Sequence, residues 1–284
     1  MTKYIIAVSG GVDSVVLLHK LIQQGDSVVV AHFDHGIRDD SAEDAMFVKR
    51  LASQYGVPFE VKREELGINA SEDEARRRRY AFLKDITNKE KGTLVTAHHA
   101  DDVIETIAIN ILRGTGWRGL AVFGDESIER PLVGLRKQEL IEYAQMYNLS
   151  WREDSTNQSD KYLRNRIRRI LSRLDDETHA LLLQYWEEQV QLRGAIDQTV
   201  ADHLGGNNEY SRYFFIHSTE RAALELLRAV VMRSAGVSLT LPQRKKLLHE
   251  IKVARPASRV DVAFGVQIRF TKQSFIVEHP SKVV

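Results

Sequence analysis

The chain has 284 residues, 43% of them hydrophobic and 28% charged, which is enough for about two globular domains with cores of their own. It contains no cysteine, and this excludes disulfides, zinc sites with cysteine ligands, iron–sulfur clusters and thiol nucleophiles. The formal net charge is only +1, and no stretch approaches the roughly 20 apolar residues of a membrane-spanning helix, so we expect a cytoplasmic protein without a membrane partner.

The first half of the chain alternates between strand and helix patterns. Short runs rich in β-branched residues predict strands over 4–8, 27–33, 58–62 and 93–97. Apolar residues at helical spacing predict helices over 13–24, 41–55, 71–91 and 101–112. Ser71 and Glu74 form a capping box at the start of the third helix. Strands separated by helices of this length predict an α/β fold with a mostly parallel, doubly wound sheet.

The second half is mainly helical before it returns to short strands. Helices are predicted over 137–147, 160–174, 177–202, 219–235 and 242–251. Strands are predicted over 259–264, 266–270 and 274–278. We therefore expect an α/β domain over 1–175, a helical linker over 176–206 and a small α+β C-terminal domain over 207–284.

A glycine-rich loop between the first strand and the first helix predicts a phosphate site. Its residues are Ser9, Gly10, Gly11, Val12, Asp13 and Ser14. The glycines allow backbone N–H groups to approach a phosphate closely, and the helix that follows adds its free amides and dipole. Asp13 offers a carboxylate beside the phosphates for a hard metal ion. The loop has neither the Walker A pattern nor the dinucleotide fingerprint, and the alternative is a plain turn with Asp13 as a helix cap.

A second motif, residues 98–105, lies where the fourth strand leads into a helix. Asp102 and Glu105 are three residues apart and therefore on one helix face, where they suit Mg²⁺ or the ammonium of an amine substrate, whose proton they could later accept. His98 or His99 could polarise a substrate or act as a base. The alternative is a capped helix start with solvated acids. The expected place at the carboxyl end of a strand favours a site.

Basic residues cluster in two further places. Arg76–Arg79 lie on one predicted helix, so at most two of them face one site, and Arg79 suits a phosphate whose charge increases during reaction. Residues 161–173 hold six basic side chains and no acid, which favours contact with RNA phosphates over a surface helix paired with acids. The residues predicted to bind RNA are Arg113, Arg164, Arg166 and Arg169.

Eight motifs in order over residues 4–174 resemble the tRNA(Ile)-lysidine synthetase family of PP-loop ATP pyrophosphatases. Besides the loop at 9–14, the motifs are HFDHGIR at 32–38, ARRRRY at 75–80, HHADDVIET at 98–106, RGTG at 113–116, RPL at 130–132 and WREDSTN at 151–157, followed by RNRIR at 164–168. The resemblance implies a Rossmann-like PP-loop domain that binds ATP through residues 9–14. It also implies that this domain adenylates the C2 oxygen of the first anticodon cytidine in a minor isoleucine tRNA with a CAU anticodon, and that L-lysine then displaces AMP.

The resemblance also suggests roles for individual residues. Asp13 and Asp102 would hold Mg²⁺, and Arg79 would neutralise phosphate charge. Asp102 and Glu105 would meet the incoming lysine or a second metal, with His98 as a proton acceptor. Longer family members have two C-terminal domains that grip tRNA, and this sequence has room for one, so we expect residues about 205–284 to hold the tRNA outside the anticodon.

Three other interpretations compete with this one. A sulfur-inserting RNA enzyme of the same superfamily would generally need cysteines or an iron–sulfur cluster, and the chain has no cysteine. A small-molecule amide-forming synthetase would share residues 9–14 but has no use for Arg164–Arg169 or the basic tail, and the later motifs do not fit it. An RNA-binding protein without catalysis has no need of Asp102 and Glu105. The sequence leaves open whether the protein is a monomer or a homodimer.

Overall fold

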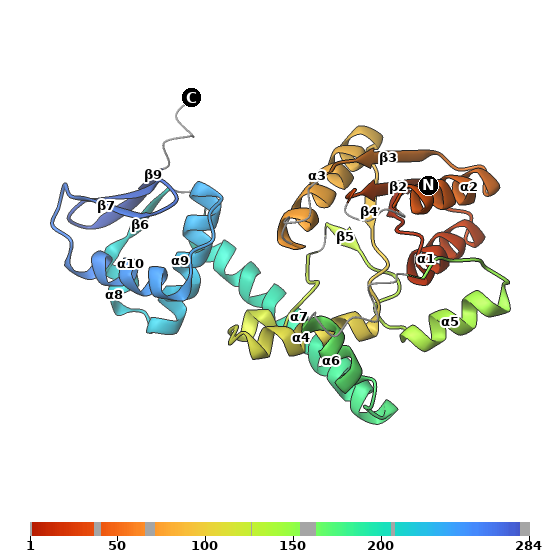
Figure 1. Cartoon of the computed structure of the whole chain (residues 1–284). Coiled ribbons are helices and arrows are strands. Elements are labelled where there is room, and N and C mark those ends of the chain that lie inside the picture. Colours follow the sequence, from red (N-terminus) through yellow and green to blue (C-terminus); the bar gives the residue numbers. More distant parts are fainter. Residues whose placement is uncertain are drawn as a thin grey trace. The chain divides into compact units, whose positions relative to one another are not determined.

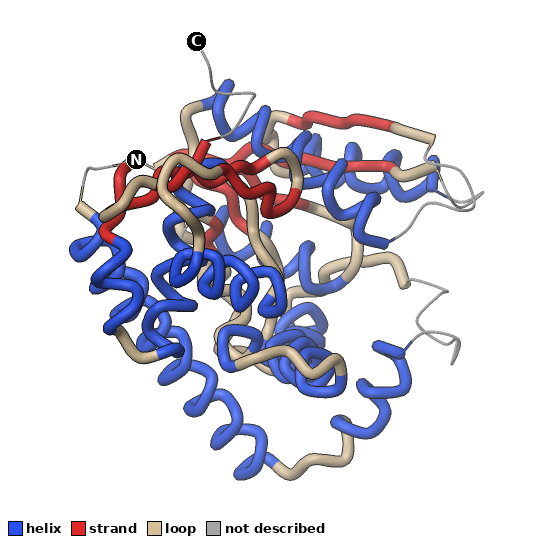
Figure 2. The backbone as a smooth tube through the Cα atoms, turned by 90° about the vertical axis from the view of Figure 1, so that its left-hand side faces the viewer, coloured by secondary structure: helices blue, strands red, loops and turns tan. Residues whose placement is uncertain are grey.

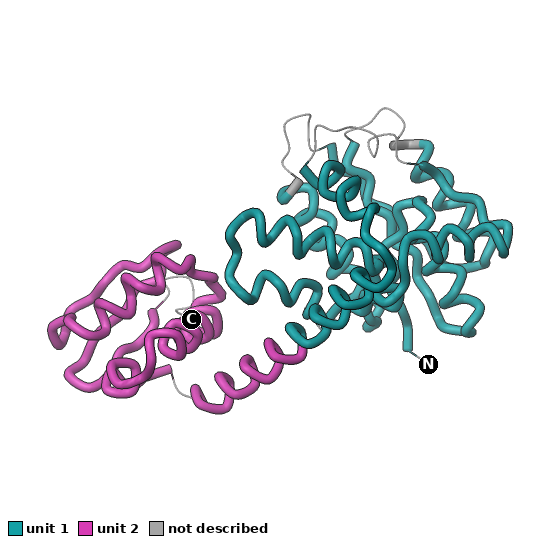
Figure 3. The backbone as a smooth tube through the Cα atoms, turned by 90° about the horizontal axis from the view of Figure 1, so that it is seen from below, with its two compact units in different colours: residues 1–190 teal, residues 191–284 magenta. Residues whose placement is uncertain are grey.

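The computed structural model describes residues 2–36, 41–65, 72–125, 127–153, 163–205 and 208–278. The chain forms two compact units, residues 1–190 and 191–284 (Figure 3). The boundary between them lies within one long helix, α7 (Asp176–Leu204). Trp186 of this helix packs in a core of the first unit, and Val200 and Leu204 pack in the core of the second.

The first unit contains a five-stranded parallel sheet (Figure 1). Its strands are β1 (Lys3–Ala7), β2 (Ser27–Asp34), β3 (Phe59–Arg63), β4 (Thr93–Val95) and β5 (Ile128–Glu129). They are ordered β3-β2-β1-β4-β5, and all of the pairings are parallel. The central strand β1 is buried on both faces, as its fully covered Ile5 and Ile6 show.

Helices cover both faces of this sheet (Figure 2), so the predicted doubly wound α/β fold is confirmed. The helices of the unit are α1 (Val12–Gln23), α2 (Ser41–Gln54), α3 (Glu72–Glu90), α4 (Ala100–Leu112), the short 3-10 helix η1 (Trp117–Gly119), α5 (Lys137–Met146) and α6 (Leu163–Leu171). On one face the core includes Val15, Val48 and Leu140 from α1, α2 and α5. On the other face Leu83 and Ile86 of α3 pack against Ile5 and Val29.

The strand order places a topological switch point between β1 and β4. The chain leaves β1 toward β2 and β3 on one side and returns to β4 and β5 on the other. In open α/β sheets, ligands bind outside the carboxyl ends of the strands at such a point. Residues 9–14 follow β1 and residues 98–105 follow β4, so the fold brings these two motifs to the same edge of the sheet.

The second unit is the expected small α+β structure. Its sheet is antiparallel in the order β6-β9-β8-β7, built from β6 (Glu209–Ser211), β7 (Arg259–Ala263), β8 (Val266–Phe270) and β9 (Ser274–Glu278). Its helices are α8 (Arg212–His217), α9 (Glu220–Ala235) and α10 (Leu241–Val253). Leu227, Ile251, Ile268, Phe270 and Phe275 fill the core.

Four short elements did not follow from the sequence pattern, among them the three-residue 3-10 helix η1. β5 and β6 are two and three residues long, which is too short for an alternating pattern to stand out. The six-residue helix α8 follows β6 directly, without a turn signal between them. Ser71, the first half of the predicted capping box, lies outside the described residues. Within the described ranges, no helix is both long and apolar enough to cross a membrane.

Candidate active site

The glycine-rich loop closes on itself through the hydroxyl of Ser14. The Ser14 Oγ accepts hydrogen bonds from the backbone N–H groups of Ser9 and Gly10, both at 3.2 Å, and donates one to the carbonyl of Gly11 at 2.9 Å. Gly10 has a φ of +96°, which L side chains rarely adopt, and a Cβ there would lie 3.4 Å from the ring of Phe47. A glycine at this position therefore keeps the loop open directly before the first turn of α1.

Asp13 lies in that first turn, and its carboxylate is paired with a residue that the sequence analysis did not select. The Nζ of Lys137 lies 2.6 Å from the Asp13 Oδ1, although the two residues are 124 positions apart. His99 is also close, with its Nε2 3.9 Å from the same oxygen. Asp13 keeps 28% of its side chain exposed, so the carboxylate can still be reached from solvent.

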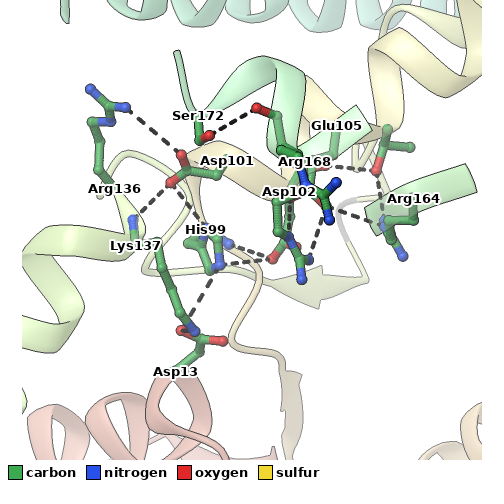
Figure 4. Close-up of polar contacts among 12 residues, drawn as sticks. Asp13, His99, Asp101, Asp102, Glu105, Arg136, Lys137, Arg164, Arg168 and Ser172 are labelled. Atoms are coloured by element: carbon green, nitrogen blue, oxygen red, sulfur yellow. Dashed lines mark hydrogen bonds and ion pairs between the residues drawn. The ribbon is translucent and has the colours of Figure 1, made fainter. Parts of the chain in front are cut away.

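His99 lies among three aspartates at the start of α4 (Figure 4). Its Nε2 is 3.5 Å from the Asp102 Oδ2, and its Nδ1 is 3.5 Å from the Asp101 Oδ2. The backbone N–H of His99 donates to the Asp102 Oδ2 at 3.2 Å, which caps the helix. Burial alone would lower the pKa of His99, but the nearby carboxylates of Asp101, Asp102 and Asp13 outweigh it and raise this pKa above its ordinary value.

Asp101 holds the surrounding elements together. It accepts the backbone N–H of Lys137 at 2.7 Å, and the Nε2 of His179 on α7 lies 3.4 Å from its Oδ1. Burial would raise the pKa of Asp101, but the contact with His99, the hydrogen bond from the Lys137 amide and the charges of the two histidines hold it well below its usual range. Asp101 is therefore an anion that fixes α4, α5 and α7 around the site.

His98 points to a different environment from its neighbour His99. Its Nδ1 is 2.9 Å from the Thr96 Oγ1, and its ring packs against Phe123 with centroids 4.5 Å apart. Burial lowers the pKa of His98 to about 4, against the opposing charge of Asp102 and with the help of nearby arginines. His98 is therefore a neutral imidazole at pH 7, able to accept a proton but only as a weak base.

Glu105 is almost completely buried, with 2% of its side chain exposed, and arginines from α6 surround it (Figure 4). The Nε of Arg168 donates to its Oε1 at 2.6 Å and the Nη2 to its Oε2 at 3.1 Å, a bidentate pair. The Nε of Arg164 lies 3.3 Å from Oε2, and its Nη2 donates to the Thr106 Oγ1 at 3.1 Å. Arg164, predicted to contact RNA, is thus turned toward this site.

The other basic residues divide between the site and the surface. Arg76 and Arg79 of α3 line a cavity beside the glycine-rich loop. The helical spacing predicts that at most two of the four consecutive arginines can face one site. Arg113 is the C-terminal cap of α4 and is exposed, as are Arg166 and Arg169 on α6. These three arginines remain accessible to a large polyanion, whereas Arg164 is not directed outward in the same way.

Two adjoining cavities share the carboxylates of Asp13 and Asp102. The larger, about 360 Å³, is lined by the loop residues Ser9 and Ser14 together with His35, Arg76, Arg79, Tyr80, His98 and Arg164. The smaller, about 260 Å³, is lined by Asp101, Glu105, His99, Lys137, Arg168 and His179. The larger cavity thus combines the predicted phosphate-binding loop with arginines, and the smaller one is rich in carboxylates.

The donor set at the junction of the cavities fits a magnesium ion. Among the residues that the structure describes, no three His, Asp or Glu side chains gather as a metal-binding group. Magnesium, however, is usually held by one or two carboxylates together with substrate phosphates and water. Asp13 and Asp102 both lie within 4 Å of the same His99 nitrogen and both border the two cavities, so they can serve as such a pair.

The sequence analysis missed Lys137, Arg168 and His179, which also line the site. Arg168 stands in a quoted motif, and its i,i+4 spacing from Arg164 was a usable signal that both face the same neighbour. Lys137 and His179 gave no local signal, because a single lysine or histidine on a helix is ordinarily a surface or core residue.

Comparisons with known proteins agree with the geometry. A model of the PP-loop domain family matches residues 1–174. The tRNA(Ile)-lysidine synthase of Thermotoga maritima is 30% identical over 291 residues, which cover 95% of this chain and 68% of that protein. The enzyme of the same name from Solibacter usitatus is 36% identical over 214 residues, covering 70% of this chain and 49% of that protein. The chain therefore spans about half the length of several curated relatives that it matches.

A solved structure shares the fold over about two thirds of the chain. The U34-tRNA thiolase NcsA from Methanococcus maripaludis, determined with its [4Fe-4S] cluster, matches with a TM-score of 0.57 over 67% of this chain and 72% of that chain. The sequences are 20% identical, so this likeness concerns the fold alone.

Proposed function

The chain belongs to the PP-loop family and, within it, to the tRNA(Ile)-lysidine synthases, and we propose that it joins lysine to a cytidine of an isoleucine tRNA with the use of ATP. In the proposed reaction, the C2 oxygen of the cytidine at the first position of a CAU anticodon attacks the α-phosphorus of ATP, and pyrophosphate leaves. The side-chain amine of free L-lysine then attacks C2, and AMP leaves. The product base, lysidine, pairs with A rather than G, so the tRNA reads AUA instead of AUG.

The observation that carries this proposal is the pair of cavities that share Asp13 and Asp102. The larger cavity offers what a triphosphate needs, namely the amides and hydroxyls of the loop and the charges of Arg76 and Arg79. The smaller cavity offers carboxylates to an alkylammonium group. Two substrates of opposite charge can therefore approach each other across the shared carboxylates.

Residues that line the larger cavity have separate roles in the proposed adenylation step. Loop residues 9–14 cradle the departing pyrophosphate, and Arg79 neutralises the charge that builds up at the phosphates. Asp13 and Asp102 are the residues that would hold Mg²⁺, which supplies Lewis-acid stabilisation of phosphate oxygens when bound.

In the second step the amine must lose a proton before or during its attack on C2. Asp102 borders both cavities and is therefore well placed to accept this proton. His98 is a second candidate acceptor, on the side of the larger cavity. Glu105 also lines the amine site, where its ion pairs with Arg168 and Arg164 reduce the negative charge that it can offer to the amine.

The tRNA is assigned to two regions of the chain. Exposed Arg113, Arg166 and Arg169 lie on the helices that border the site and suit the phosphates near the anticodon. Residues 180–284 carry a net charge of +4, and residues about 205–284 hold the tRNA outside the anticodon. ATP, lysine and tRNA meet in the cytoplasm, which is the proposed location.

The test is incorporation of radiolabelled lysine into an unmodified isoleucine tRNA transcript with ATP and Mg²⁺. We expect ATP-dependent label with the wild-type protein, none with Asp13→Ala, and normal label with Asp85→Ala, which changes an exposed aspartate on α3. Wild-type protein that leaves the tRNA unlabelled would refute the substrate assignment. Release of AMP and pyrophosphate with another amine and without tRNA would indicate a small-molecule synthetase instead.

A further inference from the structure

The glycine-rich loop has no cation of its own. The Walker A loop carries a lysine that reaches the phosphates, but residues 9–14 contain no basic residue. The structure brings a lysine to this place from 124 residues further along the chain, since the Lys137 Nζ lies 2.6 Å from the Asp13 Oδ1. Asp13 is in the first turn of the helix that follows the loop and borders both cavities, so this ammonium lies on the smaller-cavity side of the carboxylate that separates it from the loop.

The backbone of Lys137 is held in place at the start of a helix. Lys137 is the first residue of α5, and its backbone N–H donates to the Asp101 Oδ2 at 2.7 Å. The preceding residue, Arg136, is fixed by a 2.7 Å hydrogen bond from its backbone N–H to the Glu139 side chain. The start of α5 is therefore anchored, and the side chain of Lys137 extends from a fixed base.

The ammonium is also accessible to a ligand. Lys137 keeps 42% of its side chain exposed, and it lines the smaller cavity next to Asp13 and Asp102. It pairs with one oxygen of Asp13, and the second oxygen is left for a metal ion. An ion pair with this degree of exposure costs little to rearrange, because exposed pairs contribute only about 0–1 kcal/mol.

We propose that Lys137 is a further catalytic residue for the adenylation step, where its ammonium contacts the pyrophosphate group as it leaves. This inference rests on the proposed function. A bond forms between the attacking oxygen and the α-phosphorus, and the bond from that phosphorus to the bridging oxygen breaks. The electron pair of the broken bond stays on the bridging oxygen, and Lys137 neutralises the resulting charge while it keeps its proton.

Another role is consistent with the same contact. The Lys137 side chain ends in the same group as the lysine substrate, so it could instead fill the amine site until the substrate arrives. Removal of the side chain would then tighten lysine binding and leave adenylation intact. The two roles predict opposite results for one variant.

The experiment compares Lys137→Ala, Lys137→Arg and the wild-type chain in exchange of labelled pyrophosphate into ATP in the presence of the tRNA transcript. We expect Lys137→Ala to slow exchange by about 100-fold, the usual loss for one group that stabilises a developing charge. Lys137→Arg should retain at least about a tenth of the rate, because it keeps the charge but changes its geometry. Lys89→Ala is the matched control, since Lys89 forms a 2.8 Å pair with Glu60 away from both cavities.

A second readout does not depend on turnover. Calorimetry with inorganic pyrophosphate and Mg²⁺ should show at least about tenfold weaker binding to Lys137→Ala than to the wild-type and Lys89→Ala proteins. Exchange and pyrophosphate binding within threefold of wild type for Lys137→Ala would overturn the inference, as would tighter lysine binding with normal exchange. If the wild-type chain fails to exchange, the proposed function fails, and pyrophosphate binding alone then decides whether Lys137 contacts this group.

Discussion

The buried pair between Glu105 and Arg168 should dominate the stability of the first unit around the site. Replacement of Arg168 by Met leaves the Glu105 carboxylate, 2% exposed, with Arg164 at 3.3 Å as its remaining described ion-pair partner. Loss of one partner of a buried ion pair costs about 3–5 kcal/mol, because the other charge is left without compensation. Arg168 is 44% exposed and Arg164 stays in place, so we expect the lower end, about 3 kcal/mol.

The chain offers a convenient probe for this measurement. All three tryptophans, Trp117, Trp151 and Trp186, lie within residues 1–190, so their fluorescence reports on the first unit alone. For a unit of this size, 1 kcal/mol shifts the melting temperature by about 2–4 °C, and Arg168→Met should therefore lower it by roughly 6–12 °C. Arg166→Met, on the exposed side of the same helix, is the control and should change stability by less than about 0.5 kcal/mol.

A double-mutant cycle separates the pair from general damage to α6. Glu105→Gln removes the charge that makes the loss of Arg168 costly, so Glu105→Gln/Arg168→Met should be more stable than the sum of the two single changes predicts, by about 1–2 kcal/mol. Additive losses, or equal melting temperatures for Arg168→Met and Arg166→Met, would show that the bidentate contact does not stabilise the unit and would refute the reasoning.

Three further predictions concern other parts of the chain. His98 is neutral in the folded protein down to about pH 4 but takes up a proton near pH 6.5 when the chain is unfolded, so its contribution to the free energy of unfolding, up to about 3 kcal/mol, should be full above pH 6.5 and lost toward pH 4. In urea unfolding, His98→Gln should lose less stability than the wild type between pH 6.5 and pH 4, and an equal loss in both proteins would contradict this. Gly10→Ala and Gly25→Ala both place a side chain at positive φ, and each should lower the free energy of unfolding by about 1–2 kcal/mol. Only Gly10→Ala should weaken ATP binding in calorimetry, and equal ATP affinities for the two variants would argue against the loop as the phosphate site. Removal of residues 191–284 should raise the KM for tRNA much more than the KM for ATP. Similar increases in both KM values would show that the second unit does not bind the tRNA.

The parts of the structure that followed from the sequence are those with local causes. Runs of β-branched residues and helical spacing of apolar residues account for the doubly wound sheet, and the glycine at position 10 is required by its own backbone angle. The strand order then brings residues 9–14 and 98–105 together without any further information.

The parts that did not follow depend on contacts between distant segments. The Lys137 ammonium meets Asp13 across 124 residues, and Arg168 meets Glu105 across 63. The sequence predicts a helix over 160–174 with basic residues at 161–173, but which of its side chains face inward depends on how α6 is rotated against α4. Arg164 and Arg168 lie one turn apart and face Glu105, whereas Arg166 lies on the other side of the helix and stays exposed.

The two cavities carry opposite charge, and this difference determines which reactants can be bound side by side. Arg76, Arg79 and Arg164 outnumber the two shared carboxylates in the larger cavity and favour an anion, whereas four carboxylates outnumber Lys137 and Arg168 in the smaller one and favour a cation. An anion and a cation bound on either side of Asp13 and Asp102 each reduce the electrostatic cost of the other. Water, which has no charge, gains nothing from this arrangement, so in the proposed reaction the geometry favours an ammonium-bearing nucleophile over hydrolysis of the activated base.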